Sequence, residues 1–363
     1  MHQAAAYLLT NRFVLPTCES MTKALEFGLD TFGDVTRGAD GALLPHAQVI
    51  RNVTEEGVLA DQLGLDFIGL GEHHRADFAI SAPEVVLAAI AARTKDIHLG
   101  SAVTVLSSDD PIRVFQRFSA VDALSGGRAE VILGRGSFTE SFPLFGFDLR
   151  QYEELFEEKL DLFAALLKQQ PVTWQGNLRP PLQDQLIYPP VEHGALKTWI
   201  GVGGSPESVV RAAHYDLPLM LAIIGGDPKR FRPYVDLYHR AFAQFGRGVK
   251  AIGVHSPGYV ADTDEKAREE LWPDYKRMRD RIGAERGWPP MGPAEFAREA
   301  DHGSLYVGSP ETVARKIAAT AKALGLARFD LKYSAGPLSH DKLMRSIELY
   351  GRQVVPLVRD MMG

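Results

Sequence analysis

Short apolar runs alternate along this chain with longer segments in which apolar residues recur every three or four positions. The short runs are typical of buried strands, and we predict eight of them, at residues 24–29, 67–70, 97–106, 129–133, 198–202, 218–224, 251–260 and 328–333. The longer segments predict helices at residues 46–63, 83–93, 111–124, 150–168, 206–215, 228–245, 263–281, 309–324 and 341–361. Strands that alternate with helices in this way predict parallel βα units.

Eight such units in a chain of 363 residues predict an α/β fold, a (β/α)8 TIM barrel with inserted segments that forms a single domain over residues 21–363. A doubly wound open sheet is the alternative. Residues 1–20 precede the first strand, and we expect them to be an N-terminal extension outside the fold. Residues 170–194 predict an inserted excursion, and the Gly- and Pro-containing residues 283–306 predict either a lid or a surface loop.

Composition and charge exclude several classes of function. The formal net charge is −6 and no dense Lys/Arg block is present, so we expect no nucleic-acid partner. No apolar run reaches the ~20 residues that a membrane span needs, and the start lacks the basic segment and apolar core of a signal peptide. Cys18 is the single cysteine, which suits a reducing compartment, so we expect a cytoplasmic protein without disulfides.

The most informative stretch follows the predicted strand 67–70, which ends in Glu72, His73 and His74. Polar, titratable residues at the C-terminal end of a parallel strand are typical of catalytic strands in α/β enzymes. Adjacent His side chains on an extended backbone point to opposite sides and chelate poorly, so we expect no metal site. We expect one His to face a pocket and the other to face the protein, although a hydrogen-bonded rim without chemistry is the alternative.

Two further strand ends carry unusual residues. Ser101, Ala102 and Val103 are small enough to let a flat ligand approach the backbone. Arg135 lies between two glycines, where a guanidinium suits a phosphate or a carboxylate. The alternative for Arg135 is a salt bridge that ties down a loop.

The strand 198–202 is followed by Gly203, Gly204 and Ser205, directly before a helix that carries Ser208. Glycines, a helix N-terminus and hydroxyl donors together predict a phosphate cradle, although the same residues form ordinary capped turns. With Arg135, this pattern predicts an anion site for one phosphate, opposite a His. The obvious flat ligand with one phosphate is flavin mononucleotide (FMN).

Several well-known nucleotide and nucleophile motifs are missing from the sequence. No Gly-x-Gly-x-x-Gly opens an early βαβ unit, which disfavours a nicotinamide site. No Gly-x-x-x-x-Gly-Lys-Ser/Thr and no Gly-x-Ser-x-Gly occurs, so neither a P-loop nor a nucleophile elbow is expected.

Taken together, the motifs resemble the bacterial luciferase-like flavin-dependent monooxygenases from about Met21 to the end. They are Glu72-His73-His74, Leu99-Gly100-Ser101-Ala102 with Pro111, Leu124-Ser125-Gly126-Gly127-Arg128, Gly134-Arg135-Gly136, Phe145-Gly146, Gly203-Gly204-Ser205, Leu217-Pro218 and Gly308-Ser309-Pro310-Glu311. Each motif alone has little weight, but their order and spacing are specific.

The resemblance implies a barrel that binds reduced FMN, supplied by a separate flavin reductase, and that oxidises an organic substrate through a flavin C4a-(hydro)peroxide. His73 then matches the catalytic histidine, and Arg135 matches a phosphate-binding arginine. Ser205 and Ser208 match phosphate-binding hydroxyls. The Ala102–Val103 bond matches a cis peptide. We expect the cofactor to contact Glu72, Ser101, Ala102, Val103, Arg135, Gly203, Gly204, Ser205 and Ser208.

The sequence also departs from the light-emitting members of that family. Gly134 stands where they have a reactive cysteine, and Glu153 stands where they have a second phosphate-binding arginine, for which Arg150 is a candidate substitute. Gly204 replaces an acidic residue and Ile223 a tryptophan. Monooxygenation therefore stays expected, whereas light emission from a long-chain aldehyde does not.

Other functions stay open at this point. The same fold could use the deazaflavin F420 for hydride transfer, bind flavin without catalysis, or act as a lyase or aldolase on a phosphorylated sugar. Because family members commonly dimerise through their second and third helices, residues 85–92 and 114–123 predict a homodimer. Phe32, Phe138 and Phe142 indicate an apolar pocket for a small-molecule substrate, whose identity the sequence does not specify.

Overall fold

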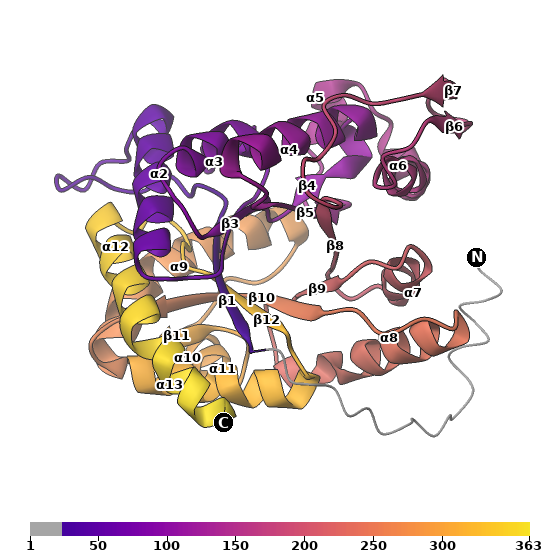
Figure 1. Ribbon diagram of the computed structural model, residues 1–363. Coiled ribbons are helices and arrows are strands. Elements are labelled where there is room, and N and C mark those ends of the chain that lie inside the picture. Colours follow the sequence, from indigo (N-terminus) through magenta and orange to yellow (C-terminus); the bar gives the residue numbers. More distant parts are fainter. Residues whose placement is uncertain (1–23) are drawn as a thin grey trace. The chain divides into compact units, whose positions relative to one another are not determined.

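The computed structural model describes residues 24–363, so the predicted extension at residues 1–20 lies outside the described residues. The described chain divides into two compact units (Figure 1). One unit contains Asp30–Gly201, and the other contains residues 24–29 together with Val202–Gly363. The chain passes between the units within strands β1 (Glu26–Thr31) and β8 (Lys197–Val202).

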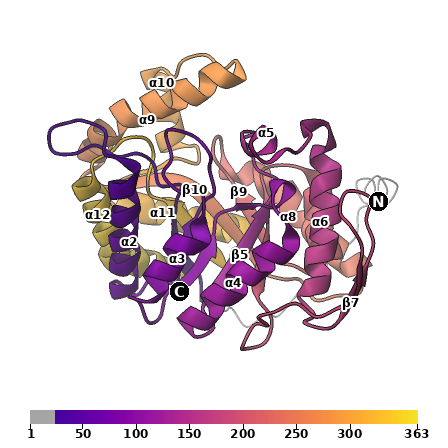
Figure 2. The same ribbon diagram turned by 90° about the horizontal axis from the view of Figure 1, so that it is seen from above.

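The unit Asp30–Gly201 is built on parallel strands in the order β2-β3-β5-β8. Their bounds are β2 (Phe67–Leu70), β3 (His98–Ser101), β5 (Ala129–Gly134) and β8, and the short β4 (Thr104–Val105) pairs with β5. Ile68 is in register with Leu99, and Leu99 with Ala129. Helices pack successively along this unit (Figure 2): α2 (His46–Gln62), α3 (Pro83–Ala91), α4 (Pro111–Ser125) and α6 (Tyr152–Leu166).

Helix α4 illustrates how local sequence sets the helix boundaries. The Asp110 carboxylate accepts hydrogen bonds from the backbone N–H groups of Ile112 and Arg113, and Pro111 occupies the first helical position. The helix ends at Gly126, whose φ of +68° suits a residue without a Cβ. These signals explain why the predicted boundaries of this helix agree with the structure to within one residue.

The second unit carries β9 (Leu219–Ala222), β10 (Ile252–Val260), β11 (Tyr306–Gly308) and β12 (Arg328–Lys332). Strand β10 pairs in parallel with β9, β11 and β12, with Val254 in register with both Leu221 and Phe329. Its helices are α7 (Pro206–His214), α8 (Arg232–Gln244), α9 (Asp264–Arg286), α10 (Pro293–Asp301), α11 (Pro310–Leu324), α12 (His340–Leu349) and α13 (Val355–Met362). The strand order β10-β12-β1-β2-β3-β5-β8-β9 is closed by the pairing of β9 with β10, so the chain is a (β/α)8 barrel, as predicted, and the open-sheet alternative is wrong.

The predicted strand 97–106 is interrupted in the structure. Strand β3 ends at Ser101, the Ala102–Val103 peptide bond is cis, and β4 begins at Thr104. The cis bond that the family resemblance implied is therefore confirmed. The break has no signal in the hydrophobic pattern, because residues on both sides of it are equally apolar.

The expectation that residues 283–306 form a loop or lid without regular structure is wrong. Helix α9 continues to Arg286, α10 occupies Pro293–Asp301 and β11 follows. Phe296 of α10 packs against Trp272 and Tyr275 of α9, with ring centroids 4.9 and 6.0 Å apart. Helix α10 has only nine residues, with Pro293 at its first position, and its contact with α9 stabilises it.

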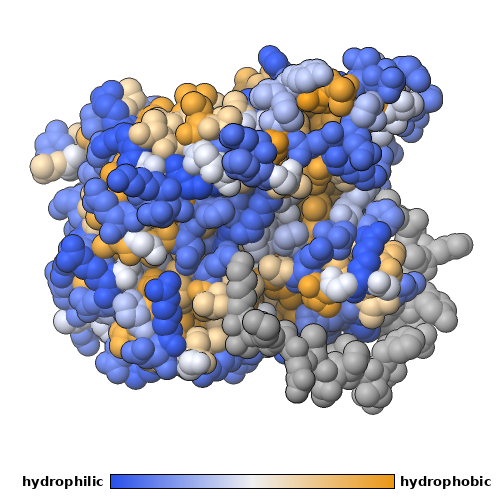
Figure 3. All heavy atoms as spheres, in the orientation of Figure 1, coloured by the Kyte–Doolittle hydropathy of each residue, from blue (hydrophilic) through white to orange (hydrophobic). Residues whose placement is uncertain are grey.

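Residues 170–194 form the predicted excursion, which contains an antiparallel pair of β6 (Val172–Trp174) and β7 (Leu182–Gln185) (Figure 1). Polar side chains dominate the face drawn in Figure 3, with apolar side chains scattered among them. Among the helices of residues 24–363, none is both long and apolar enough to cross a bilayer.

Candidate cofactor and active site

Glu72 and His74 are held by the protein around them. The buried Glu72 carboxylate accepts a hydrogen bond from the Val105 N–H at 3.0 Å, and its other oxygen lies 2.8 Å from His74 Nε2. The His74 ring also packs edge-on against Phe145, with centroids 5.0 Å apart. These contacts tie strand β4 to the residues that follow β2.

His73 has a different set of neighbours, as expected for adjacent residues on an extended backbone. Its imidazole centroid lies 4.4 Å from the ring centroid of Phe32, 4.6 Å from Phe78 and 5.0 Å from Phe138. Its backbone N–H donates to the Ile80 carbonyl at 2.9 Å, which fixes the main chain. His73 is therefore a titratable imidazole that packs within a cluster of three aromatic rings.

Arg75 supports this aromatic cluster and was missed in the sequence analysis. Its guanidinium lies 4.8 Å from the centroid of Phe138, forms an ion pair with Glu140 and bonds Asp77 at 3.1 Å. The Arg75 side chain is buried, so the contact holds Phe138 beside His73. Its position directly after Glu-His-His was the only available signal, and an arginine there has many other uses.

The small residues at the strand ends are required by packing within the unit. A Cβ on Gly134 would lie 2.6 Å from Val103 Cγ2, and one on Gly71 would lie 2.3 Å from Phe32 Cδ1 and 2.8 Å from the Ala102 oxygen. Val103 therefore fills the space into which a side chain at residue 134 would extend. The Ser101 hydroxyl is fully buried and bonded within the protein.

Arg135 follows β5 and is a salt-bridge partner of Glu153, in the first turn of α6. Its guanidinium carbon also lies 5.6 Å from the centroid of the Tyr152 ring. Arg150, the candidate second arginine, instead pairs with Asp148 and has a side chain that is 90% exposed. Arg135 is thus the arginine that the structure holds at the end of β5.

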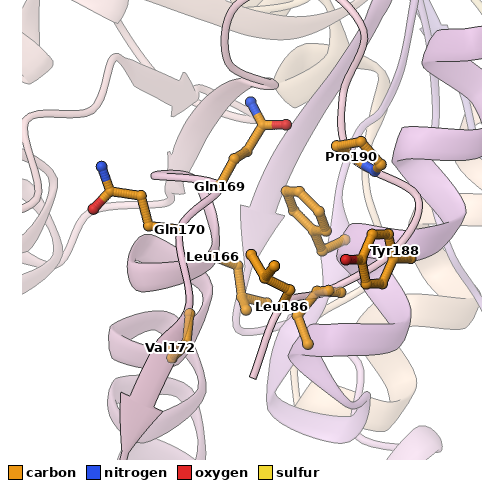
Figure 4. Close-up of a pocket in the computed structure, with 9 residues that line it drawn as sticks. Leu166, Gln169, Gln170, Val172, Leu186, Tyr188 and Pro190 are labelled. Atoms are coloured by element: carbon orange, nitrogen blue, oxygen red, sulfur yellow. The ribbon is translucent and has the colours of Figure 1, made fainter. Parts of the chain in front are cut away.

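The apolar pocket expected from three phenylalanines forms only in part. Phe32 and Phe138 contact His73, whereas Phe142 is fully buried and stacks on Tyr152 with centroids 5.5 Å apart. A pocket of about 190 Å³ lies elsewhere in this unit, beside the end of α6 (Figure 4). Leu166, Val172, Leu186 and Tyr188 line it, and no predicted cofactor residue does.

In the other unit, Gly203, Gly204 and Ser205 lead into α7. The Ser205 hydroxyl oxygen accepts a hydrogen bond from the Ser208 N–H at 3.3 Å and donates to Glu207 at 2.8 Å, so it caps the helix. The Ser208 hydroxyl lies 3.3 Å from that of Ser205. A Cβ on Gly203 would meet no atom within 4 Å, which leaves the backbone open to a ligand.

Buried Arg211 lies behind this pair of serines, and its Nη1 donates to the Ser208 hydroxyl at 3.3 Å. Two hydroxyls, a guanidinium and a helix N-terminus are a donor set that suits a phosphate. Arg211 was missed in the sequence analysis, although its spacing of three residues from Ser208 places both on one helical face.

Lys159 of α6 is buried close to the loop after β4. Its Nζ donates to the Ser107 carbonyl at 2.7 Å and lies 3.8 Å from the centroid of the Phe147 ring. Burial lowers the pKa of the Lys159 ammonium from 10.5 to about 8, although nearby carboxylates oppose the shift.

This shift predicts a stability that depends on pH. Between about pH 8 and 10.5 the unfolded chain keeps a proton on Lys159 that the folded protein has lost, so stability from this residue rises with pH. We expect Lys159→Met to remove that rise. Urea unfolding of both proteins from pH 7.5 to 10.5 tests this, and a constant difference in unfolding free energy would contradict it.

Comparison with known proteins places the chain in a family. The family model of luciferase-like monooxygenases matches residues 31–328. The chain is 28% identical over 316 residues to 4-hydroxyprotoasukamycin monooxygenase of Streptomyces nodosus subsp. asukaensis, an alignment that covers 82% of this chain and 83% of the relative.

Solved structures have the same fold. Monooxygenase RslO1 from Streptomyces bottropensis has a TM-score of 0.81 at 20% identity and covers 92% of this chain and 99% of its own. A second structure is the oxygenating constituent of the Pseudomonas putida 3,6-diketocamphane monooxygenase, solved with FMN. Its TM-score is 0.72 at 21% identity, and the match covers 92% of this chain and 99% of that one. An F420-dependent secondary alcohol dehydrogenase, solved with an F420–acetone adduct, has a TM-score of 0.71 at 16% identity, with coverage of 93% and 100%.

The matched family model spans most of the described barrel and includes the residues around His73 and Arg135. This chain is therefore an enzyme of the luciferase-like monooxygenase family.

Proposed function

We propose that this enzyme uses reduced FMN and O2 to oxidise a small organic substrate, and that a separate reductase supplies the flavin. The observation that carries this proposal is the imidazole of His73, which lies among three phenylalanine rings just after β2. Bound reduced FMN supplies the electrons that activate O2. The protein supplies binding, exclusion of water and a group that moves protons.

In this proposal His73 is the catalytic residue. One imidazole nitrogen holds a proton and passes it to or from the reacting oxygen, which is general acid–base catalysis. Phe32, Phe78 and Phe138 limit the access of water to that nitrogen and present an apolar surface to the substrate. We infer that the substrate is largely apolar.

In this proposal the cofactor is bound by the residues that the sequence predicted for it. Glu72, Ser101, Ala102 and Val103 belong to the segments assigned to the flat ring. The phosphate is assigned to Arg135, to the hydroxyls of Ser205 and Ser208, and to the open backbone at Gly203 and Gly204. Each of these segments has a guanidinium, Arg135 itself after β5 and Arg211 bonded to the Ser208 hydroxyl in α7, and a guanidinium suits a phosphate.

Arg135→Ala is expected to weaken FMN binding by about tenfold to a hundredfold, because a hydrogen bond to a charged group contributes about 1.5–3 kcal/mol. The affinity for riboflavin, which lacks the phosphate, should change less than threefold. Dissociation constants from flavin fluorescence measure both ligands. Arg150→Ala is the matched control, since Arg150 pairs with Asp148. Equal losses for FMN and riboflavin would contradict the assignment of the phosphate to Arg135.

F420-dependent hydride transfer is the second candidate, because an F420-dependent dehydrogenase shares the fold. Titration of the protein with FMN and with F420 separates the two. Family membership gives no support to the non-catalytic or sugar-lyase alternatives. A homodimer through α3 and α4 stays part of the proposal, supported by Val85 of α3, which is 70% exposed, and the mass in solution tests it.

A further inference from the structure

The arginine assigned to the cofactor phosphate already has an anionic partner. Arg135 forms an ion pair with Glu153, which lies 18 residues later in the chain at the start of α6. The Arg135 side chain is 24% exposed, whereas that of Glu153 is 55% exposed. The guanidinium is thus held by the protein, and its partner is accessible to solvent.

The surroundings keep both side chains in place. The Tyr152 hydroxyl donates to the Gly136 carbonyl at 2.5 Å, which links the start of α6 to the loop after β5. The Arg135 guanidinium also lies near the Tyr152 ring, while its terminal nitrogen contacts the carboxylate of Glu153. A carboxylate in the first turn of a helix is further stabilised by the helix dipole.

We infer that Glu153 is a specificity-determining residue that competes with the cofactor phosphate for Arg135 and thereby limits affinity for phosphorylated flavin. This inference rests on the proposed function, which assigns the phosphate to Arg135. A phosphate that reaches the guanidinium either displaces the carboxylate or lies beside it. If the phosphate displaces the carboxylate, the Arg135–Glu153 ion pair is lost. If the phosphate lies beside the carboxylate, the two negative charges repel each other. Both effects lower the affinity of the protein for FMN.

The exposure of Glu153 makes displacement the easier route, because its carboxylate can turn into solvent. Among variants of one binding site, weaker affinity usually reflects a faster dissociation rate rather than a slower association rate. Glu153 would therefore speed the exchange of FMN, which suits an enzyme that receives reduced flavin from another protein and must release the oxidised form.

The test replaces Glu153 with Gln, which keeps the shape and removes the charge. Dissociation constants for FMN and riboflavin are measured by flavin fluorescence in the full-length wild type, Glu153→Gln, Arg135→Ala and the double variant. We expect Glu153→Gln to lower the dissociation constant for FMN by about twofold to fivefold and to leave that for riboflavin unchanged. In the Arg135→Ala background the same substitution should change FMN affinity less than twofold, and stopped-flow dilution should show slower FMN release from Glu153→Gln.

Glu154→Gln is the matched control, because Glu154 also lies in the first turn of α6. This substitution removes the same charge from the protein and the same interaction with the helix dipole as Glu153→Gln does. Thermal unfolding of each variant checks the fold. Unchanged or weaker FMN binding in Glu153→Gln, or equal changes for FMN and riboflavin, would overturn the inference. A different result would contradict the proposed function itself: the Arg135→Ala substitution would then weaken FMN and riboflavin binding equally.

Discussion

His73→Asn is expected to lower turnover by about 10²- to 10⁴-fold, the range that general acid–base catalysis contributes. The imidazole lies within a ring of Phe32, Phe78 and Phe138, and asparagine cannot exchange a proton there. The fold and FMN affinity should be retained, because Glu72 and His74 make the contacts that tie this segment to β4. Oxygen uptake with reduced FMN, together with the ratio of oxidised substrate to hydrogen peroxide, measures the effect.

His193→Asn is the control for that experiment, since the His193 side chain is 70% exposed and lies in a loop. It should retain full turnover. If His73→Asn turned over at the wild-type rate, His73 would have no part in the mechanism. Loss of FMN binding together with activity would instead give His73 a role in holding the cofactor.

Arg128→Leu is expected to lower the free energy of unfolding by about 3–5 kcal/mol, because it leaves several buried carbonyl groups without a donor. The buried guanidinium donates to the carbonyls of Ala91, Thr94, Ile97 and Ser125 and to the Thr94 hydroxyl, over 2.7–3.1 Å. It thus caps the end of α3 and joins that end to the start of β3.

Arg128→Lys keeps the charge but lacks the fork of donors, so it should recover only part of the loss. Urea unfolding followed by circular dichroism compares the three proteins. Arg93→Leu is a suitable control, because Arg93 pairs with Glu55 at the surface, where an exposed ion pair contributes about 0–1 kcal/mol. A loss below ~1 kcal/mol in Arg128→Leu would refute this account of the carbonyl cap.

Hydrogen bonds and close packing in the core account for two residues of the family pattern that we do not assign to the cofactor. The Leu-Ser-Gly-Gly-Arg motif ends in Arg128, whose contacts are all structural. The same applies to Gly134, where a close Val103 leaves no room for a side chain. A motif can therefore identify a family through residues that only maintain its fold.

Much of the fold could be predicted from local sequence. Helices α4 and α11 start at a capping residue followed by a proline, Asp110–Pro111 and Ser309–Pro310, and stop at Gly126 and Gly325. The strands are apolar runs because both of their faces are buried. The differences from the predicted elements include the break after Ser101, which has no signal in the hydrophobic pattern, and the short helix α10, whose flanking Gly and Pro residues indicated a loop.

The sequence by itself determined the alternation of strands and helices, the family and the residues that follow each strand, because these depend on short-range periodicity and on motif order. Tertiary structure alone decided that Phe32, Phe78 and Phe138 surround His73, that Arg211 supports Ser208, and that Glu153 pairs with Arg135. Except for Arg211 and Ser208 on α7, and His73 and Phe78 in the loop after β2, these partners lie on different loops or elements. Their contacts depend on how the backbone folds between them, which no pattern of neighbouring residues encodes.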